Sequence, residues 1–362
     1  MAKQEIEIDP NASVESFDFS TMLADPSDYE VIRLETNDDC VIGGVTRLYF
    51  RQDMMFIFDE ESKSVLCFND DGTFNHRIGS RGRAANEYLD VWDVFVSDDT
   101  VFVYDNETYK ILCYDFSGKF LRKIDVSGFP VNNILVKDNK IYLSNYWGNT
   151  EEDRYRFFVT DLNGELIKKE LPFEPQDEGY SFSGNRYSLF ADSLGVNIWD
   201  VIYRISGDEI TPRYHIDFGN RALPRKYYPV DLKNLVSEGV HDKYILGVEN
   251  MYESSRYLLF DFEYVDDSYV AVYDKRDDKI VISESLQNNS LLDMSPGRYF
   301  IENDNLYSYY PATDILFFDE YIWSQPPHAG TEDSDVMKAG IAGMTEDDNG
   351  VIIRHKLRTN EP

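Results

Sequence analysis

Short apolar stretches alternate with polar breaks along most of the chain. Residues 56–59 read FIFD and residues 102–105 read FVYD, and each is followed by a polar break and a second apolar stretch, VLCF or ILCY. Aromatic and β-branched residues that alternate over about four to eight positions are typical of β-strands. The pattern therefore predicts an all-β protein built from short antiparallel strands.

The predicted strands belong to a repeat. Residues 56–78 and 102–124 align without a gap at an offset of 46, and eight of these 23 positions are identical. In each copy a glycine follows the second apolar stretch, where a hairpin turn needs a positive φ angle. Equivalent glycines recur further along the chain, so that the four turn positions are Gly72, Gly118, Gly164 and Gly207.

An apolar residue lies five positions before each turn glycine. These residues are Cys67, Cys113, Val159 and Ile202. We expect this column to pack between neighbouring sheets, which makes Cys67 and Cys113 core residues rather than redox or metal-binding groups. The third cysteine, Cys40, lies in a polar run, and an odd count of cysteines argues against a disulfide framework.

A unit of about 40–50 residues with four short antiparallel strands is typical of a β-propeller blade. We therefore predict a single six-bladed β-propeller domain over residues 29–357, preceded by a polar segment at 1–28. The first five blades are expected near residues 45–78, 92–124, 133–170, 188–216 and 244–284.

The sixth blade is incomplete. Residues 299–302, 306–310 and 315–318 supply three predicted strands, and a propeller commonly closes by taking the missing strand from one terminus. Residues 29–35 and 351–357 are the two candidates, and we favour the N-terminal one as the outer strand because closure removes an exposed sheet edge.

Two segments interrupt the repeat. In the insertion near residues 220–240, Leu232, Leu235 and Val236 have helical spacing and Gly239 follows as a stop, which predicts a short helix. Residues 324–350 are expected to form a loop or short helix on the rim.

Part of the chain resembles an NHL repeat. The resemblance rests on Gly79, Gly82, Glu87 and Tyr88 in a linker, and then on 101–105, 114–115, Gly118 and Phe120. In place of the usual Gly-Pro-Gly the linker has Ala84-Ala85-Asn86. Over residues 29–357 the chain is similar to six-bladed propeller proteins abundant in Bacteroides-type Gram-negative bacteria, which usually carry a lipoprotein or secretory signal.

This resemblance implies a cell-envelope location, either periplasmic or as a surface lipoprotein whose signal is not present in this sequence. It implies no reaction. From the residues alone, a cytoplasmic protein and a mature exported protein both remain open, because residues 1–13 contain no apolar signal core.

Charge narrows the set of partners. Asp and Glu number 67 against 35 Lys and Arg, which gives a net charge of −32. Such a chain repels phosphate backbones and anionic headgroups, so we expect no nucleic-acid partner. No stretch approaches the roughly 20 apolar residues of a transmembrane helix, so no transmembrane segment is predicted.

No motif predicts catalysis. The five histidines lack metal-ligand spacing, and the chain has no G-x-S-x-G or S-x-x-K nucleophile motif. Acidic pairs such as Asp70-Asp71 and Asp98-Asp99 occupy predicted turns, where Asp caps its own backbone. We therefore predict no catalytic residue, no cofactor and no metal site.

Arginine and aromatic residues gather in the loops expected over the central channel. Aromatic faces stack on sugar C–H groups, and guanidinium groups pair with carboxylates. The alternative is that the aromatic residues wedge the blades together while the arginines pair with the abundant acids. The candidate ligand-binding residues are Arg81, Arg83, Glu87, Trp92, Tyr146, Trp147, Arg154, Arg186, Trp199, Tyr252 and Arg256.

Three functions remain open from the sequence. The favoured one is a non-catalytic binding propeller of the cell envelope, with a glycan, a peptide or an envelope protein as its partner. The second is a glycan-cleaving hydrolase or lyase that uses carboxylates at the channel mouth. The third is a structural assembly module.

Overall fold

The computed structural model describes residues 4–145, 151–173, 187–190, 193–227, 232–265, 267–287, 293–294, 298–326 and 329–360. The fold is all-β, with six blades of mostly antiparallel strands, and the predicted six-bladed β-propeller is confirmed. The chain forms two compact units with three blades each. We call residues 33–181 the central unit, and residues 1–32 with 182–362 the terminal unit.

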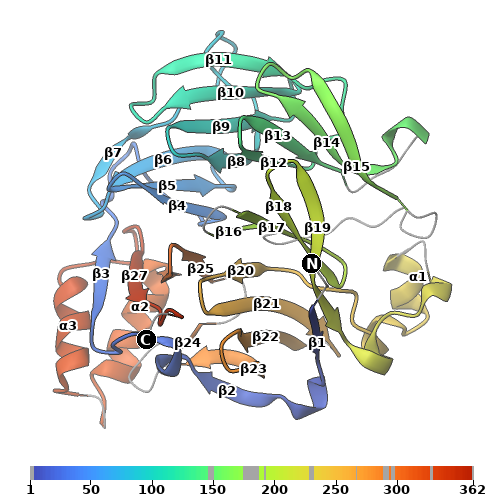
Figure 1. The fold of residues 1–362 in the computed structure, drawn as a ribbon. Coiled ribbons are helices and arrows are strands. Elements are labelled where there is room, and N and C mark those ends of the chain that lie inside the picture. Colours follow the sequence, from blue (N-terminus) through green and yellow to red (C-terminus); the bar gives the residue numbers. More distant parts are fainter. Residues whose placement is uncertain are drawn as a thin grey trace. The chain divides into compact units, whose positions relative to one another are not determined.

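The central unit holds three four-stranded antiparallel sheets, coloured blue to green in Figure 1. Blade one contains β4 (Arg47–Arg51), β5 (Met54–Asp59), β6 (Ser64–Asn69) and β7 (Phe74–Arg77). Blade two contains β8 (Val91–Val96), β9 (Thr100–Asp105), β10 (Lys110–Asp115) and β11 (Phe120–Asp125). Blade three contains β12 (Asn133–Lys137), β13 (Lys140–Ser144), β14 (Tyr155–Asp161) and β15 (Leu166–Pro172).

The terminal unit holds blades four to six. Blade four contains β16 (Tyr187–Phe190), β17 (Ser193–Ile198), β18 (Val201–Ser206) and β19 (Glu209–Asp217). Blade five contains β20 (Met251–Glu253), β21 (Tyr257–Tyr264), β22 (Asp267–Asp274) and β23 (Lys279–Gln287), with the short β24 (Asp293–Met294) beside β23. The predicted helix in the insertion is confirmed as α1 (Leu232–Ser237).

Blade six takes strands from both termini. Its order is β25 (Tyr299–Glu302), β26 (Asn305–Tyr310), β27 (Val351–Lys356) and β3 (Tyr29–Arg33), so the N-terminal segment is the outer strand, as expected. The prediction of a strand at 315–318 was wrong, because these residues lie in α2 (Ala312–Phe318). Ala312 and Ile315 are buried whereas Phe317 is exposed, which is a helical period rather than the alternation of a strand.

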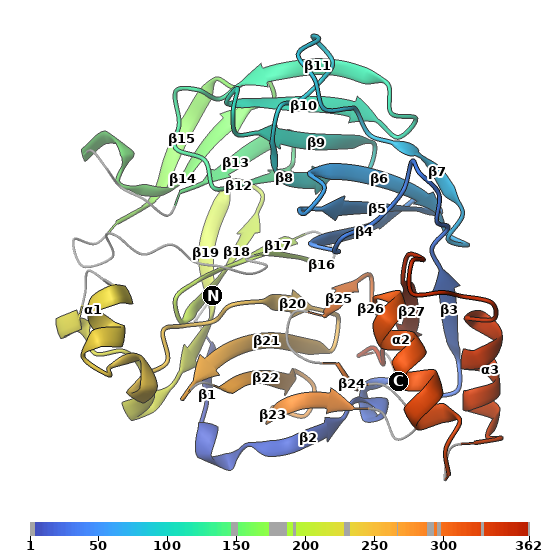
Figure 2. The same cartoon turned by 180° about the vertical axis from the view of Figure 1, so that it is seen from behind.

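Helix α2 runs on into a π-helical segment, Asp319–Trp323, and a further helix, α3 (Glu332–Gly340), follows before β27. Both helices are drawn in red in Figure 2.

The segment expected to be a polar extension contributes two further strands. Strand β1 (Gln4–Glu7) pairs in parallel with β19, and β2 (Val14–Asp18) pairs in parallel with β23. Short 3-10 turns follow each strand, at Pro10–Ala12 and Phe19–Met22. We call residues 4–22 the strap; Figure 2 shows it along the outer strands of blades four and five. Ile6, Ile8 and Phe19 anchor it by burial.

The repeat positions behave as predicted. Gly72, Gly118, Gly164 and Gly207 all have positive φ angles, between 58° and 87°. The column five residues earlier is buried at all four positions. Burial raises the pKa of Cys67 to about 12 and that of Cys113 to about 11, so neither thiol ionises at neutral pH.

Candidate functional site

Two buried carboxylates of the central unit serve the backbone. Asp59, at the end of β5, accepts hydrogen bonds from the backbone N–H groups of Gly43 (2.9 Å) and Gly44 (3.2 Å) and from the hydroxyl of Ser62 (2.7 Å). It thereby ties the linker that enters blade one to the loop between β5 and β6.

Asp105 repeats this arrangement at the offset of 46. It accepts from the N–H groups of Leu89 (3.0 Å) and Asp90 (3.2 Å) and from the hydroxyl of Thr108 (2.8 Å). Carboxylates saturated by backbone donors are structural clamps, since their lone pairs are already occupied. We therefore assign Asp59 and Asp105 a role in stabilising the fold and no role in catalysis.

The linker between β7 and β8 forms a braced loop. The N–H of Gly82 donates to the carbonyl of Tyr88 (2.9 Å), and the N–H of Ala84 donates to Oε2 of Glu87 (2.8 Å). The carboxylate of Glu87 folds back so closely that a methyl group at Gly82 would lie 1.9 Å from it. Glu87 thus holds the loop together. Arg81 and Arg83 of the same loop are exposed.

Trp92, the second residue of the innermost strand β8, is a large aromatic side chain that stays partly open at this end of the unit. It is 43% exposed, and its indole N–H donates to the carbonyl of Asn132 at 2.9 Å. The ammonium of Lys63 lies 5.7 Å from the centroid of the ring, within cation–π range. The hydrogen bond orients the indole while much of its surface stays accessible.

The next residue, Asp93, points inward. Its carboxylate lies 3.5 Å from Nε of Arg47 on β4 and accepts a hydrogen bond from the N–H of Ile134 on β12 at 2.9 Å. Burial raises the pKa of Asp93, and the nearby Arg47 guanidinium opposes that rise. Asp93 therefore links the innermost strands of all three blades of the central unit.

Sequence reasoning missed two residues at the same end of the blades, the exposed Tyr109 and the half-buried Lys63. Lys63 and Tyr109 are equivalent at the offset of 46, each with a φ of 53° in the loop between the second and third strands. Tyr109 is 51% exposed. The repeat contained the signal, because both follow a clamping aspartate by four positions. We call Lys63, Arg81, Arg83, Trp92 and Tyr109 the exposed set.

The remaining residues predicted to bind a ligand do not belong to the exposed set. Arg154 is half-buried in the loop before β14. Tyr146, Trp147 and Arg186 lie outside the described residues.

Trp199 and Tyr252, in the terminal unit, are buried, at 8% and 5% exposure. The ring of Tyr252 packs against those of Tyr299 and Phe300, at centroid distances of 5.3 and 6.1 Å. Burial of this kind fits the alternative in which aromatic residues wedge the blades together.

Arg256 does not lie on the expected loop end. It follows β20, whereas Asn250 precedes that strand, so the two lie at opposite ends of it. Its guanidinium binds the carboxylate of Asp274 at 2.7 Å and that of Asp277 at 3.4 Å. Arg256 therefore fits the alternative in which the arginines pair with the abundant acids.

Within the described residues, no group of three or more His, Cys, Asp or Glu side chains is arranged to hold a metal ion. In the same part of the chain, no helix has the length and apolar character needed to cross a bilayer.

A family model described as "Domain of unknown function (DUF4934)" matches residues 5–356. The chain belongs to the DUF4934 family. No sequence among curated proteins matches this family member.

Among solved structures, the DUF4934 chain is similar to a Bacteroides fragilis protein named "Putative exported protein", at 16% identity and a TM-score of 0.77, over 99% of this chain and 100% of that one. A member of the DUF4221 family from Bacteroides vulgatus is 12% identical, with a TM-score of 0.49, over 92% of this chain and 97% of that one. At these identities the first likeness shows the shared fold, and we draw no argument from the second.

Proposed function

We propose that this DUF4934 chain is a non-catalytic binding protein of the bacterial cell envelope, and that it binds an acidic glycan through the exposed set of the central unit. The observation that carries the proposal is Trp92, a half-exposed indole oriented by a hydrogen bond to Asn132 and flanked by Lys63. An oriented aromatic face suits the C–H face of a sugar ring.

The charge of the exposed set supports an anionic ligand. Lys63, Arg81 and Arg83 are basic in a chain whose net charge is −32, and the arginines belong to a braced loop rather than a freely moving one. Because the backbone of the loop is already ordered, less backbone entropy is lost when the arginines bind a carboxylate or sulfate group.

The use of the buried acids supports binding rather than cleavage. Asp59 and Asp105 accept several backbone hydrogen bonds each, and Asp93 is engaged with Arg47 and Ile134. Glycoside cleavage needs a pair of carboxylates directed at the substrate. The carboxylates of Asp59, Asp93 and Asp105 instead contact groups of the protein itself.

The envelope location remains part of the proposal. It is supported by the likeness in fold to the Bacteroides fragilis protein named as exported, and by the resemblance to Bacteroides-type propeller proteins. The NHL-like character of the repeat and lipid attachment are likewise predictions that accompany it.

The test is a binding screen on purified protein with acidic and neutral oligosaccharides, together with chromatography of the same mixtures for released products. We expect saturable binding of acidic glycans without product. Trp92→Ala should weaken binding about tenfold, through the lost ring contact, and Arg81→Ala with Arg83→Ala should weaken it further at low salt. Arg276→Ala, an exposed arginine in a turn of blade five, is the matched control.

Three results would contradict the proposal. Product release would favour the glycan-cleaving alternative. If the Trp92→Ala variant binds the glycan as tightly as the unaltered chain, the exposed set is not the binding site. Absence of any glycan binding, with assembly on envelope proteins instead, would favour the structural module.

A further inference from the structure

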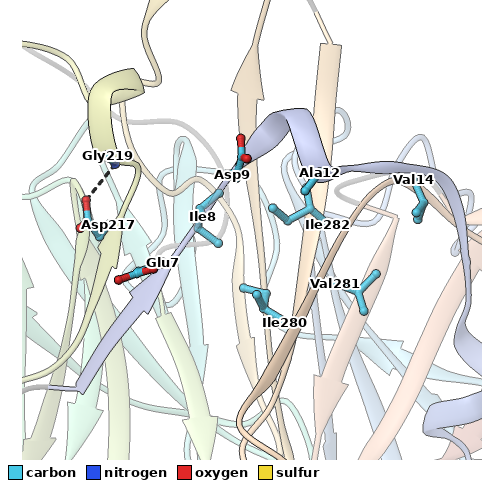
Figure 3. A pocket seen from close by; sticks show the side chains of 10 residues that line it. All are labelled: Glu7, Ile8, Asp9, Ala12, Val14, Asp217, Gly219, Ile280, Val281 and Ile282. Atoms are coloured by element: carbon cyan, nitrogen blue, oxygen red, sulfur yellow. Dashed lines mark hydrogen bonds between the residues drawn. The ribbon is translucent and has the colours of Figure 1, made fainter.

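The strap borders an open cavity of about 560 Å³ in the terminal unit (Figure 3). Its walls come from the strap, from the end of β19 with the turn after it, and from the first residues of β23. It contains none of the exposed set, so an inference about it goes beyond the proposed function.

The floor of the cavity is aliphatic. Ile8 of the strap and Ile282 of β23 are buried, and Ile280 is half-buried, so part of its side chain faces the cavity. A volume of this size falls in the range of about 300–1,000 Å³ that is usual for small-molecule sites. A single metal ion would leave such a floor uncovered, whereas a short apolar body would cover it.

The rim is acidic. Glu7, Asp9 and Asp217 line the cavity, and none of its ten lining residues is basic. Asp9 caps the turn at Asn11, and Asp217 accepts from the N–H of Gly219 at 2.8 Å, so each has a fixed orientation. Glu7 is exposed, and its side chain makes no hydrogen bond or ion pair within the described residues.

Two of these acids are direct partners in the sheet. In the parallel pairing of β1 with β19, Glu7 lies opposite Asp217 and Glu5 lies opposite His215. A hydrogen bond joins the side chains of Glu5 and His215, and Nε2 of His215 also lies 3.2 Å from the carboxylate of Asp200. Glu7 and Asp217 place like charges side by side, which destabilises a pair of strands. A cation bound between them would remove that repulsion.

We propose that this cavity is a binding site for a small amphipathic organic cation, with an ammonium or guanidinium group at Glu7 and Asp217 and a short apolar body on the isoleucine floor. The acids select the charge, and the floor selects against small hydrated ions, which gain nothing from apolar contact.

The experiment is calorimetric titration of the purified chain with n-hexylamine, compared with hexanol, sodium hexanoate and ammonium chloride at matched ionic strength. We expect hexylamine to bind saturably and at least about tenfold more tightly than the other three, since only it satisfies both rim and floor. Its affinity should fall as NaCl is added.

Variants separate a binding role from a structural one. Glu7→Gln should weaken hexylamine about three- to fivefold, yet leave the melting temperature of the free protein unchanged or raised, because the like-charge pair is gone. Glu15→Gln, an exposed strap residue outside the cavity, is the matched control for both measurements. Ala12→Phe, on the exposed turn of the strap, should block the cavity and abolish binding.

The proposal fails if hexylamine does not bind, if hexanol or hexanoate binds as tightly, or if Glu7→Gln and Glu15→Gln weaken binding equally. Glycan binding through Trp92 should be unaffected by the Glu7 variant. Failure here is therefore distinguishable from failure of the proposed function.

Discussion

The imidazole of His355 on β27 packs edge-on against the ring of Phe19 in the strap, with 5.6 Å between the ring centroids. The ring of Tyr29 on β3 lies 5.5 Å from it on another side. His355 is 1% exposed, and neither ring nitrogen has a hydrogen-bond partner within the described residues. This contact joins the strap to blade six through a histidine that the fold holds neutral.

The first prediction concerns pH. Burial lowers the pKa of His355 to about 4. Between that value and the unfolded value of about 6.5, the unfolded chain binds a proton that the folded chain excludes, so the free energy of unfolding falls as pH falls. The contribution reaches roughly 3 kcal/mol at the acid end of this window.

Denaturant unfolding at pH 7, 6 and 5 measures this effect. His355→Phe keeps an aromatic ring in the core but cannot titrate, so it should lose stability less steeply than the unaltered chain. The difference between the two slopes isolates His355 from the other groups, which both proteins share. Equal slopes would show that His355 does not contribute.

The second prediction concerns the turn glycines. Gly164 has a φ of +87°, and a methyl group there would lie 2.7 Å from the carbonyl oxygen of Asp125. Gly164→Ala should therefore cost about 1–2 kcal/mol for the left-handed backbone, and more for the clash. Gly128→Ala is the control in the same unit, because Gly128 lacks a positive φ and has open space around it. Urea melts that show equal losses for the two variants would refute this.

The third prediction concerns the aspartate clamps. Asp105→Ala removes the acceptor of several backbone N–H groups near the linker into blade two and should cost about 2–5 kcal/mol. Asp105→Asn should lie between, since an amide keeps only one acceptor oxygen. Asp98→Asn, on an exposed turn, should change the unfolding midpoint little. If the Asp105→Ala variant is as stable as the control, the hydrogen bonds of Asp105 do not stabilise the fold.

The fourth prediction concerns the cysteines. Cys40, Cys67 and Cys113 are all buried free thiols. A thiol reagent should react slowly with the folded protein and with all three cysteines in guanidinium, because burial suppresses both access and ionisation.

The repeat shows which side chain should be able to replace Cys67. Cys67→Val should be tolerated, since valine occupies the equivalent position at Val159. Cys67→Ser should cost about 1–3 kcal/mol, because it buries a hydroxyl between sheets. A serine variant as stable as the valine variant would show that the column does not need to be apolar.

Local patterns predicted what depends on local physics. Strand alternation and turn glycines follow from the pleat of a single strand and from the φ angle of a single residue, so four turns and six blades could be read from the chain. The short run at 315–318 was misread, because an apolar stretch of that length suits a strand or a helix equally. Only packing of Ile315 and Trp323 in the core decided it.

The site residues also divide into those that local patterns predicted and those that only packing revealed. The exposed arginines of the linker after β7 could be recognised from charge and loop position. That Arg256 binds the carboxylate of Asp274 and that Lys63 reaches the ring of Trp92 depended on contacts between segments. No pattern within one segment carries this information.

The blade, its turn geometry and its apolar column could be predicted from the chain, because each depends on neighbours a few residues apart. Three features came only from long-range packing: the parallel pairing of residues 4–22 with β19 and β23, the joint use of both termini in blade six, and the position of Glu7 beside Asp217. Those pairings join residues some two hundred or more positions apart. Their free energy comes from burying Ile6, Ile8 and Phe19 on surfaces that exist only once the blades have formed.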